Sequence, residues 1–246
     1  MTCRAGIARI NILLIEQLAA QPPPEIQING KQQTMKHRST RAIFSEWQRL
    51  AFEKKGSLRA PARESIKPRK LGRHLSNLFL LEEDKNAELV FRLAGTQICT
   101  LFGRELRTVR FASLWPHSNR PALDELLGNV NSLLVPALSR HDGISLAGRS
   151  LAFEMLLAPL RPHENHKASL LGAISPLDDV SWVGADPLVL ANLNTITPLA
   201  PDMILEQEVS NPPVRAANAS NMVLCETNLP AVRRSPRLRI INGGKV

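Results

Sequence analysis

Residues 78–94 read LFLLEEDKNAELVFRLA, and this stretch decides the fold that we expect. The apolar run Leu78–Leu81 is followed by a polar turn at Glu83–Asn86, and residues 88–94 then alternate polar and apolar side chains. Alternation with a period of two is typical of a strand buried on one face. Two such strands joined by a tight turn predict an antiparallel pair.

The sequence after this pair predicts helices and then more strands. We expect a helix from Thr96 to Phe102, ended by Gly103, and a longer helix from Pro121 to Leu138 with its leucines on one side. Further strands are expected at 144–148, 151–160 and 168–175. This order predicts an α+β fold, a five-stranded antiparallel sheet with helices on one face.

A flanking helix is expected ahead of the sheet, and a shorter one after it. Ile43, Trp47 and Leu50 are spaced as one apolar helical stripe, with Ser39 or Thr40 as the N-cap and Gly56 at the end. Trp47 is predicted to anchor this helix against the following domain. The apolar residues between Leu188 and Ile196 predict a short helix that packs beside it.

The two ends of the chain are expected to lie outside the domain, which we place at residues 39–197. Residues 1–38 are predicted to be a disordered or extension segment, in which the apolar run 7–20 is too short and too charged to span a membrane or to be a secretory signal. A start at Met35 is a further hypothesis, which the intact mass of the native protein tests. The prolines scattered through residues 198–246 predict a disordered tail that includes an Arg-rich run.

Positive charge is concentrated in one segment. Residues 36–73 hold twelve Lys and Arg against three Glu, and their net charge of +9 equals that of the whole chain. Such a segment contacts phosphates or anionic lipid, or it is simply a solvated helix face with a linker. No aromatic residues interleave with the cations as they do on base-stacking surfaces, which favours the solvated face.

Seven short blocks follow one another in a specific order: Phe91–Thr96, Cys99, Leu101–Leu106, Leu114–Trp115, Glu154–Leu160, Leu171–Gly172 and Trp182–Gly184. In this order they resemble a PAS-like family that is common in alphaproteobacteria. The likeness extends from about Ile43 to Thr197. The sequence departs from the usual PAS pattern at Thr108, where a glycine is frequent.

The resemblance implies a sensor or docking domain for signal transduction in the bacterial cytoplasm, as a dimer or with a signalling partner such as a histidine kinase. The resemblance does not indicate which ligand the domain binds, and the cofactor is unknown. Cys99 lacks the sequence context of the photoreactive flavin-binding subclass, so we expect a buried, inert thiol. The histidines lie mostly in predicted polar turns, which does not favour a haem ligand.

Four residues are candidates for ligand contact. Arg92 and Glu154 lie in predicted strands; if both pointed inward, they would pair or hold a polar ligand. The alternative is that both face solvent, because strand residues alternate between faces. Trp115 and Phe102 are candidate lining residues, with core packing as the alternative.

No catalytic or metal site is predicted, and we do not expect an enzyme. The adjacent residues Ser139, His141 and Asp142 lie in a predicted loop, and adjacency alone does not make a triad. The three cysteines form no C-x-x-C pair for zinc. The preferred function is a PAS-type signalling adaptor or sensor; the alternative is a nucleic-acid-associated regulator that uses residues 36–73 and the Arg-rich tail.

Overall fold

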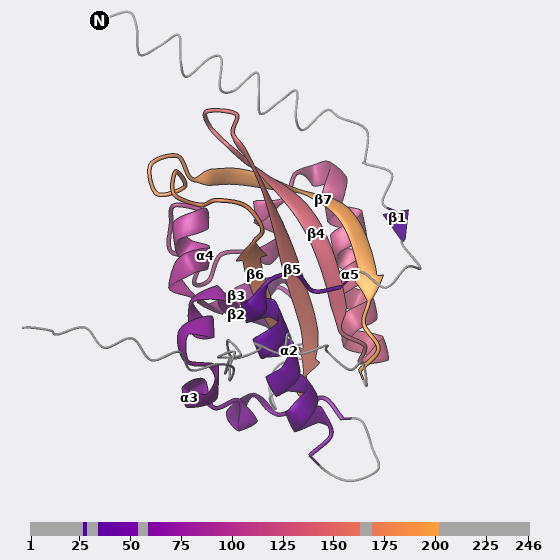
Figure 1. Ribbon diagram of the computed structural model, residues 1–246. Helices are drawn as coiled ribbons and strands as arrows, with labels where there is room; N and C mark the ends of the chain where they lie inside the picture. The colour runs from indigo at the N-terminus through magenta and orange to yellow at the C-terminus, as the bar shows by residue number, and fades with distance from the viewer. Residues whose placement is uncertain (1–26, 29–33, 54–58, 163–168, 202–246) are drawn as a thin grey trace, which may run out of the picture. The chain divides into compact units, whose positions relative to one another are not determined.

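A seven-stranded sheet forms the centre of the computed structural model, which describes residues 27–28, 34–53, 59–162 and 169–201. The strand order is β1-β7-β4-β5-β6-β2-β3 (Figure 1). Six strands pair in antiparallel fashion, and the two-residue β1 runs parallel to β7. The strands are β1 (Gln27–Ile28), β2 (Leu78–Glu83), β3 (Leu89–Ala94), β4 (Ala137–Ser145), β5 (Ser150–Leu160), β6 (Ser169–Pro176) and β7 (Leu188–Pro198).

Helical segments fall into two groups along the chain, one before β2 and one between β3 and β4. The first group is α2 (Arg38–Ala51), η1 (Arg63–Ser65), α3 (Pro68–Leu71) and η2 (Gly72–Asn77). The second is α4 (Thr96–Leu101), η3 (Phe111–Leu114), η4 (His117–Asn119) and α5 (Arg120–Leu133). None of the helices in the described ranges has the length and hydrophobicity that a membrane span requires.

The helices between β3 and β4 pack on one face of the sheet as expected, but α2 packs on the other, so the expectation of helices on one face alone is wrong. Successive residues of β5 point in opposite directions. Phe153, Met155 and Leu157 join an inner core with the second helical group, whereas Leu156 and Ala158 join an outer core with α2. Nearly every residue of β5 is apolar, and strands of this kind are covered on both faces.

The expected five strands are also wrong, since the sheet has a sixth antiparallel strand in β7. The segment was predicted as a short helix, but it pairs with β4 along nearly its whole length. Val189, Thr195, Ile196 and Thr197 are β-branched, which favours a strand. The apolar spacing fits either structure, and the free edge of β4 decides in favour of the strand.

The boundary between α5 and β4 lies earlier than expected. The helix ends at Leu133, Leu134 adopts a left-handed conformation with φ 56°, and β4 begins at Ala137 and not at Ile144. Pro136 has no backbone N–H and therefore marks the end of the helix. As a result Ser139, which was expected in a loop, lies on a central strand paired on both sides.

The N-terminal helix and its anchoring tryptophan are confirmed. The indole N–H of Trp47 donates to the carbonyl of Pro159 at 2.8 Å, and its ring is buried in the outer core. The N-cap is His37 instead of Ser39 or Thr40; its side chain accepts a hydrogen bond from the Ser39 N–H. The helix ends at Ala51, five residues before the expected end at Gly56. Most of residues 1–38 and the tail beyond Pro201 lie outside the described residues.

Candidate functional site

Arg92 lies on the edge strand β3 and is half exposed. Its Nε is 3.5 Å from Oε2 of Glu82, whose other oxygen pairs with Arg63 of η1. This places Arg92 in a surface ion-pair group at the edge of the sheet.

Glu154 lies on β5 in the outer face of the sheet and is fully buried. Its Oε1 accepts a hydrogen bond from the backbone N–H of His37 at 2.8 Å, and its Oε2 accepts one from Lys36 at 3.0 Å. The guanidinium of Arg140 lies 3.7 Å away. Glu154 thus holds the start of α2 against the sheet.

The fold does not bring Arg92 and Glu154 together. Strands β6 and β2 separate β5 from β3. Glu82, the partner of Arg92, is opposite Ser169 of β6, and Glu154 is opposite Ser175, which is about 20 Å further along that strand. A ligand role for either residue stays a prediction, and the two have separate partners.

Trp115 and Phe102 lie in the inner core, on the other face of the sheet. The indole N–H of Trp115 donates to Nδ1 of His141 at 3.1 Å. The neutral ring must then carry its proton on Nε2, which donates to Ser139 Oγ at 2.8 Å. Full burial lowers the pKa of His141 to about 3. His141 is therefore a buried strand residue and not part of a polar turn.

Cys99, the one cysteine among the described residues, lies on α4. Its side chain is partly exposed, in contrast to the buried thiol that was expected. Burial of part of the side chain raises the pKa of the Cys99 thiol, which keeps it protonated. A raised pKa disfavours the reactive thiolate.

A groove of about 650 Å³ lies between the β2–β3 hairpin, the η3 turn and α5. The hairpin contributes Glu83 and Glu88, and the turn contributes Arg110 and Ser113. Helix α5 contributes the third wall, with Arg120, Asp124, Leu127, Gly128 and Asn131. None of the four residues predicted from the sequence lines it.

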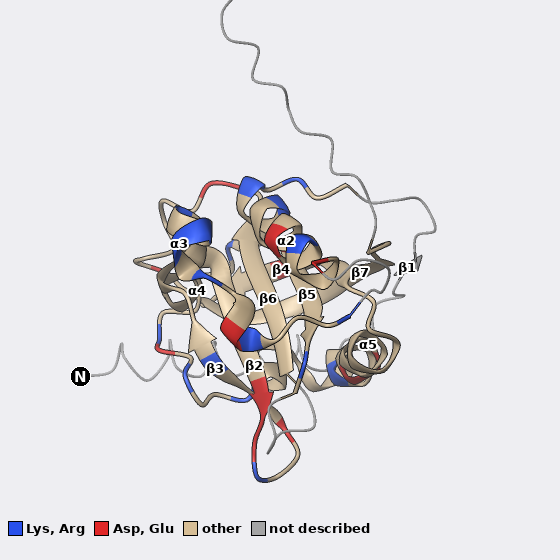
Figure 2. Ribbon diagram, turned by 90° about the horizontal axis from the view of Figure 1, so that it is seen from below, with Lys and Arg blue, Asp and Glu red and all other residues tan. Residues whose placement is uncertain are grey.

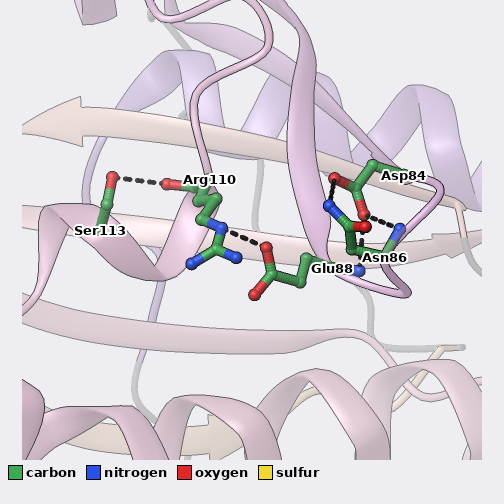
Figure 3. A network of polar contacts seen from close by, with 5 residues as sticks. All are labelled: Asp84, Asn86, Glu88, Arg110 and Ser113. Carbon is green, nitrogen blue, oxygen red and sulfur yellow. Dashed lines mark hydrogen bonds and ion pairs between the residues drawn. The ribbon is translucent and has the colours of Figure 1, made fainter.

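One wall of the groove is held by a polar network, which Figure 3 shows. The carboxylate of Glu88 pairs with Nε of Arg110, which joins the hairpin to the turn before α5. Asp84 accepts hydrogen bonds from the backbone N–H groups of Asn86 at 2.8 Å and Glu88 at 3.0 Å. The bond from the Glu88 N–H is the main reason that the pKa of Asp84 is lowered. This wall is preorganised before any ligand binds.

The opposite wall, on α5, offers polar groups that the described residues leave open. Nη1 of Arg120 lies 3.0 Å from Nδ1 of His117. The buried Nε of Arg120 has no hydrogen-bond partner among the described residues. Asp124 is exposed one turn further along the helix and forms no salt bridge with the described residues. The groove therefore presents both a guanidinium and a carboxylate.

Gly128 stands in the middle of α5 and faces open space. A methyl group at this position would meet no heavy atom within 4 Å. Glycine inside a helix costs about 1 kcal/mol relative to alanine, so this position weakens the helix without any steric need. An isolated glycine in a predicted helix was the signal in the sequence that could have pointed to this groove.

A second hollow, of about 390 Å³, lies at the start of α2 and is lined by Lys36, Arg140, Asp142 and Asp178, among others. Its carboxylates are already engaged. Asp142 accepts a hydrogen bond from Asn194 at 2.7 Å, and Asp178 accepts one from the Ala152 N–H at 3.1 Å. The groove beside α5 is therefore the better candidate for a ligand.

A family model described as "PAS domain" matches residues 35–175. This span is more than half of the chain, so the chain belongs to the PAS domain family. Membership indicates a role in signalling or sensing, and PAS domains are typically sensory and not catalytic. A comparison with curated proteins found no match. The left-handed backbone at Thr108, with φ 65°, has the conformation for which a glycine is favoured, and PAS domains often place glycine here.

Proposed function

We propose that this domain is a PAS-type sensor that binds a small polar ligand in the groove beside α5 and passes the signal on by docking to other proteins. The observation that supports the proposal is the open space at Gly128, between the preorganised hairpin wall and the free polar groups of α5. A volume of about 650 Å³ is in the range of ligand pockets.

The mixed charge of the groove favours a ligand that carries both an anionic and a cationic or hydrogen-bond-donating group. Arg120 is placed to contact the anionic group and Asp124 the other. Such a ligand would tie α5 to the β2–β3 hairpin, two elements that are separated in the sequence by α4 and the η turns. Ligand binding would thereby restrain α5 relative to the β2–β3 hairpin, and this restraint would change the surface that docks to other proteins.

Replacement of Gly128 by leucine tests this proposal. The new side chain fills the groove from the helix side, so we expect the bound small molecule to be lost. The fold should be as stable as the wild type or more stable by up to about 1 kcal/mol, because leucine favours a helix more than glycine does. Native mass spectrometry of the full chain purified from its own host measures binding, and thermal unfolding measures stability.

Gly184→Leu is the matched control, since Gly184 is exposed in a turn outside the groove and also has open space around it. The control should keep the small molecule. A wild-type protein that carries no small molecule, or a Gly128→Leu protein that retains it, would contradict the proposal.

The docking part of the proposal concerns partners. We expect a signalling protein such as a histidine kinase or another regulator, or a second copy of the chain, in the cytoplasm of an alphaproteobacterium. Support comes from the family alone. Capture of such a regulator from the host, or a dimer in light scattering, would support it, whereas a strictly monomeric protein without a partner would count against it.

A further inference from the structure

Six exposed cations lie on the elements that precede the sheet. They come from the start of α2, from α3 and from η2, which contact one another. Figure 2 shows the blue segments on α2 and α3. We call this surface the cationic face, and its members are Lys36, Arg38, Lys67, Arg69, Lys70 and Arg73.

Contacts between these elements show that the face is continuous. Ser39 Oγ of α2 lies 3.0 Å from Nδ1 of His74 in η2. The pKa of His74 is lowered by burial and then by the nearby charges of Arg73 and Arg38, which places both cations beside it. Lys67 and Lys70 likewise lie close enough to act on Glu46 of α2.

The charges of this face are only partly compensated by the fold, because Glu46, the carboxylate near Lys67 and Lys70, is itself paired with Arg49. Among the described residues, no carboxylate lies within salt-bridge distance of any of the six. Two other cations of the same sequence segment are paired, since Arg49 binds Glu46 and Glu53, and Arg63 binds Glu82. Like charges held side by side without salt-bridge partners repel one another, so binding of an anionic partner would relieve that repulsion.

The chemistry of the face fits a polyanion better than a protein. Protein interfaces have a centre depleted of charge and rich in apolar anchors. The large apolar residues that are exposed in the described ranges are Phe52, Leu93, Leu133, Leu134 and Leu146, and none of them belongs to α3 or η2. Nucleic-acid backbones are bound by Lys and Arg alone, and this contact needs no stacked aromatic residue.

We propose that the cationic face of α2, α3 and η2 binds the phosphate backbone of nucleic acid without reading the base sequence. This activity uses residues outside the groove and does not depend on the ligand proposed for it.

Salt dependence of binding tests the proposal in the full chain. Fluorescence anisotropy with a labelled 20-base-pair DNA duplex of random sequence should show an affinity that falls steeply with salt. The slope of log K against log salt is negative, and its magnitude decreases by about 0.9 for each phosphate contact that is removed. For the double variant Arg69→Ala/Lys70→Ala we therefore expect a slope whose magnitude is about 1.8 less than that of the wild type.

The matched control is Lys85→Ala/Arg149→Ala, which removes the same charge from the β2–β3 and β4–β5 hairpins, both exposed and outside the face. Its slope should stay within about 0.5 of the wild type. The Arg-rich tail is the same in all variants, so it does not affect the difference.

Three outcomes would overturn the proposal. The first is no binding to the duplex at low salt, and the second is an equal slope for the two double variants. The third is that the cationic face binds phosphatidylserine vesicles or a polyglutamate peptide more tightly than it binds the duplex at the same salt concentration. That result would indicate that the face binds a lipid surface or an acidic protein.

Discussion

His141 is the residue whose environment differs most from what its neighbours in the sequence indicate. It is flanked by Arg140 and Asp142, yet its ring is fully buried and stacks on Phe153 at a centroid distance of 4.9 Å. Because strand residues alternate between faces, a buried ring and two charged neighbours are compatible. The neutral ring links Trp115 to Ser139 and thereby satisfies two buried polar groups.

Acid should destabilise the protein through this residue. The folded-state pKa of His141, about 3, is below its unfolded value of 6.5, so the unfolded state binds the extra proton first as the pH falls. The stabilisation by the neutral ring is complete above about pH 6.5 and is lost toward pH 3, by up to about 1.4 kcal/mol per pH unit.

His141→Phe isolates this effect. The variant leaves the indole N–H of Trp115 without its acceptor and removes one of the two partners of Ser139, so it should be about 1–3 kcal/mol less stable at pH 7. The gap between wild type and variant should shrink between pH 6 and pH 4 in urea unfolding. Parallel pH profiles for the two proteins would contradict this assignment.

At the scale of elements, α2 depends on a contact with a strand more than 100 residues away in the sequence. Propensity and the apolar stripe predict the helix, but its position on the sheet depends on Glu154, which accepts two backbone hydrogen bonds ahead of the first turn. The sequence shows Glu154 as an acid within an apolar strand, but it does not show its partners. These partners are backbone N–H groups, which every residue except proline has, so no residue type identifies them.

Glu154→Gln should loosen this attachment. The amide nitrogen of glutamine is a donor, so one of the two backbone N–H groups would face another donor, and Arg140 would lose its counter-charge. We expect a loss of about 1–3 kcal/mol in the free energy of unfolding and faster hydrogen exchange in α2. Glu53→Gln, which removes an exposed ion pair with Arg49, should cost less than about 0.5 kcal/mol.

At the scale of the whole molecule, one sheet separates two cores that share the strands β2, β4, β5 and β6. The inner core lies under α4 and α5, and the outer core lies under α2. Because adjacent residues of β5 belong to different cores, neither core can lose its order without affecting the backbone of the other.

Leu156→Ala and Leu157→Ala test this coupling, since the two neighbours are fully buried on opposite faces of β5. Each should cost about 2–5 kcal/mol. Both variants should unfold in a single transition with an unchanged urea m-value. A second transition in either variant would show that the two cores unfold separately.

The amino-acid sequence by itself determined the elements whose patterns are local. The β2–β3 hairpin follows from alternation and a polar turn, and the helices α2 and α4 follow from spacing and flanking residues. The order of short blocks also determined the PAS family, because those blocks carry the turns and the packing positions of the fold.

Tertiary structure alone decided the features that depend on distant partners. The segment 188–198 became a strand because β4 offered a free edge, and the sheet acquired a second core because α2 folded back onto β5. The groove forms where α5, the η3 turn and the β2–β3 hairpin come together, and the sequence of none of them alone specifies this arrangement. The periodicity of the sequence indicates which side of a helix or strand is apolar. Packing between elements that are distant in the sequence decides what that side contacts.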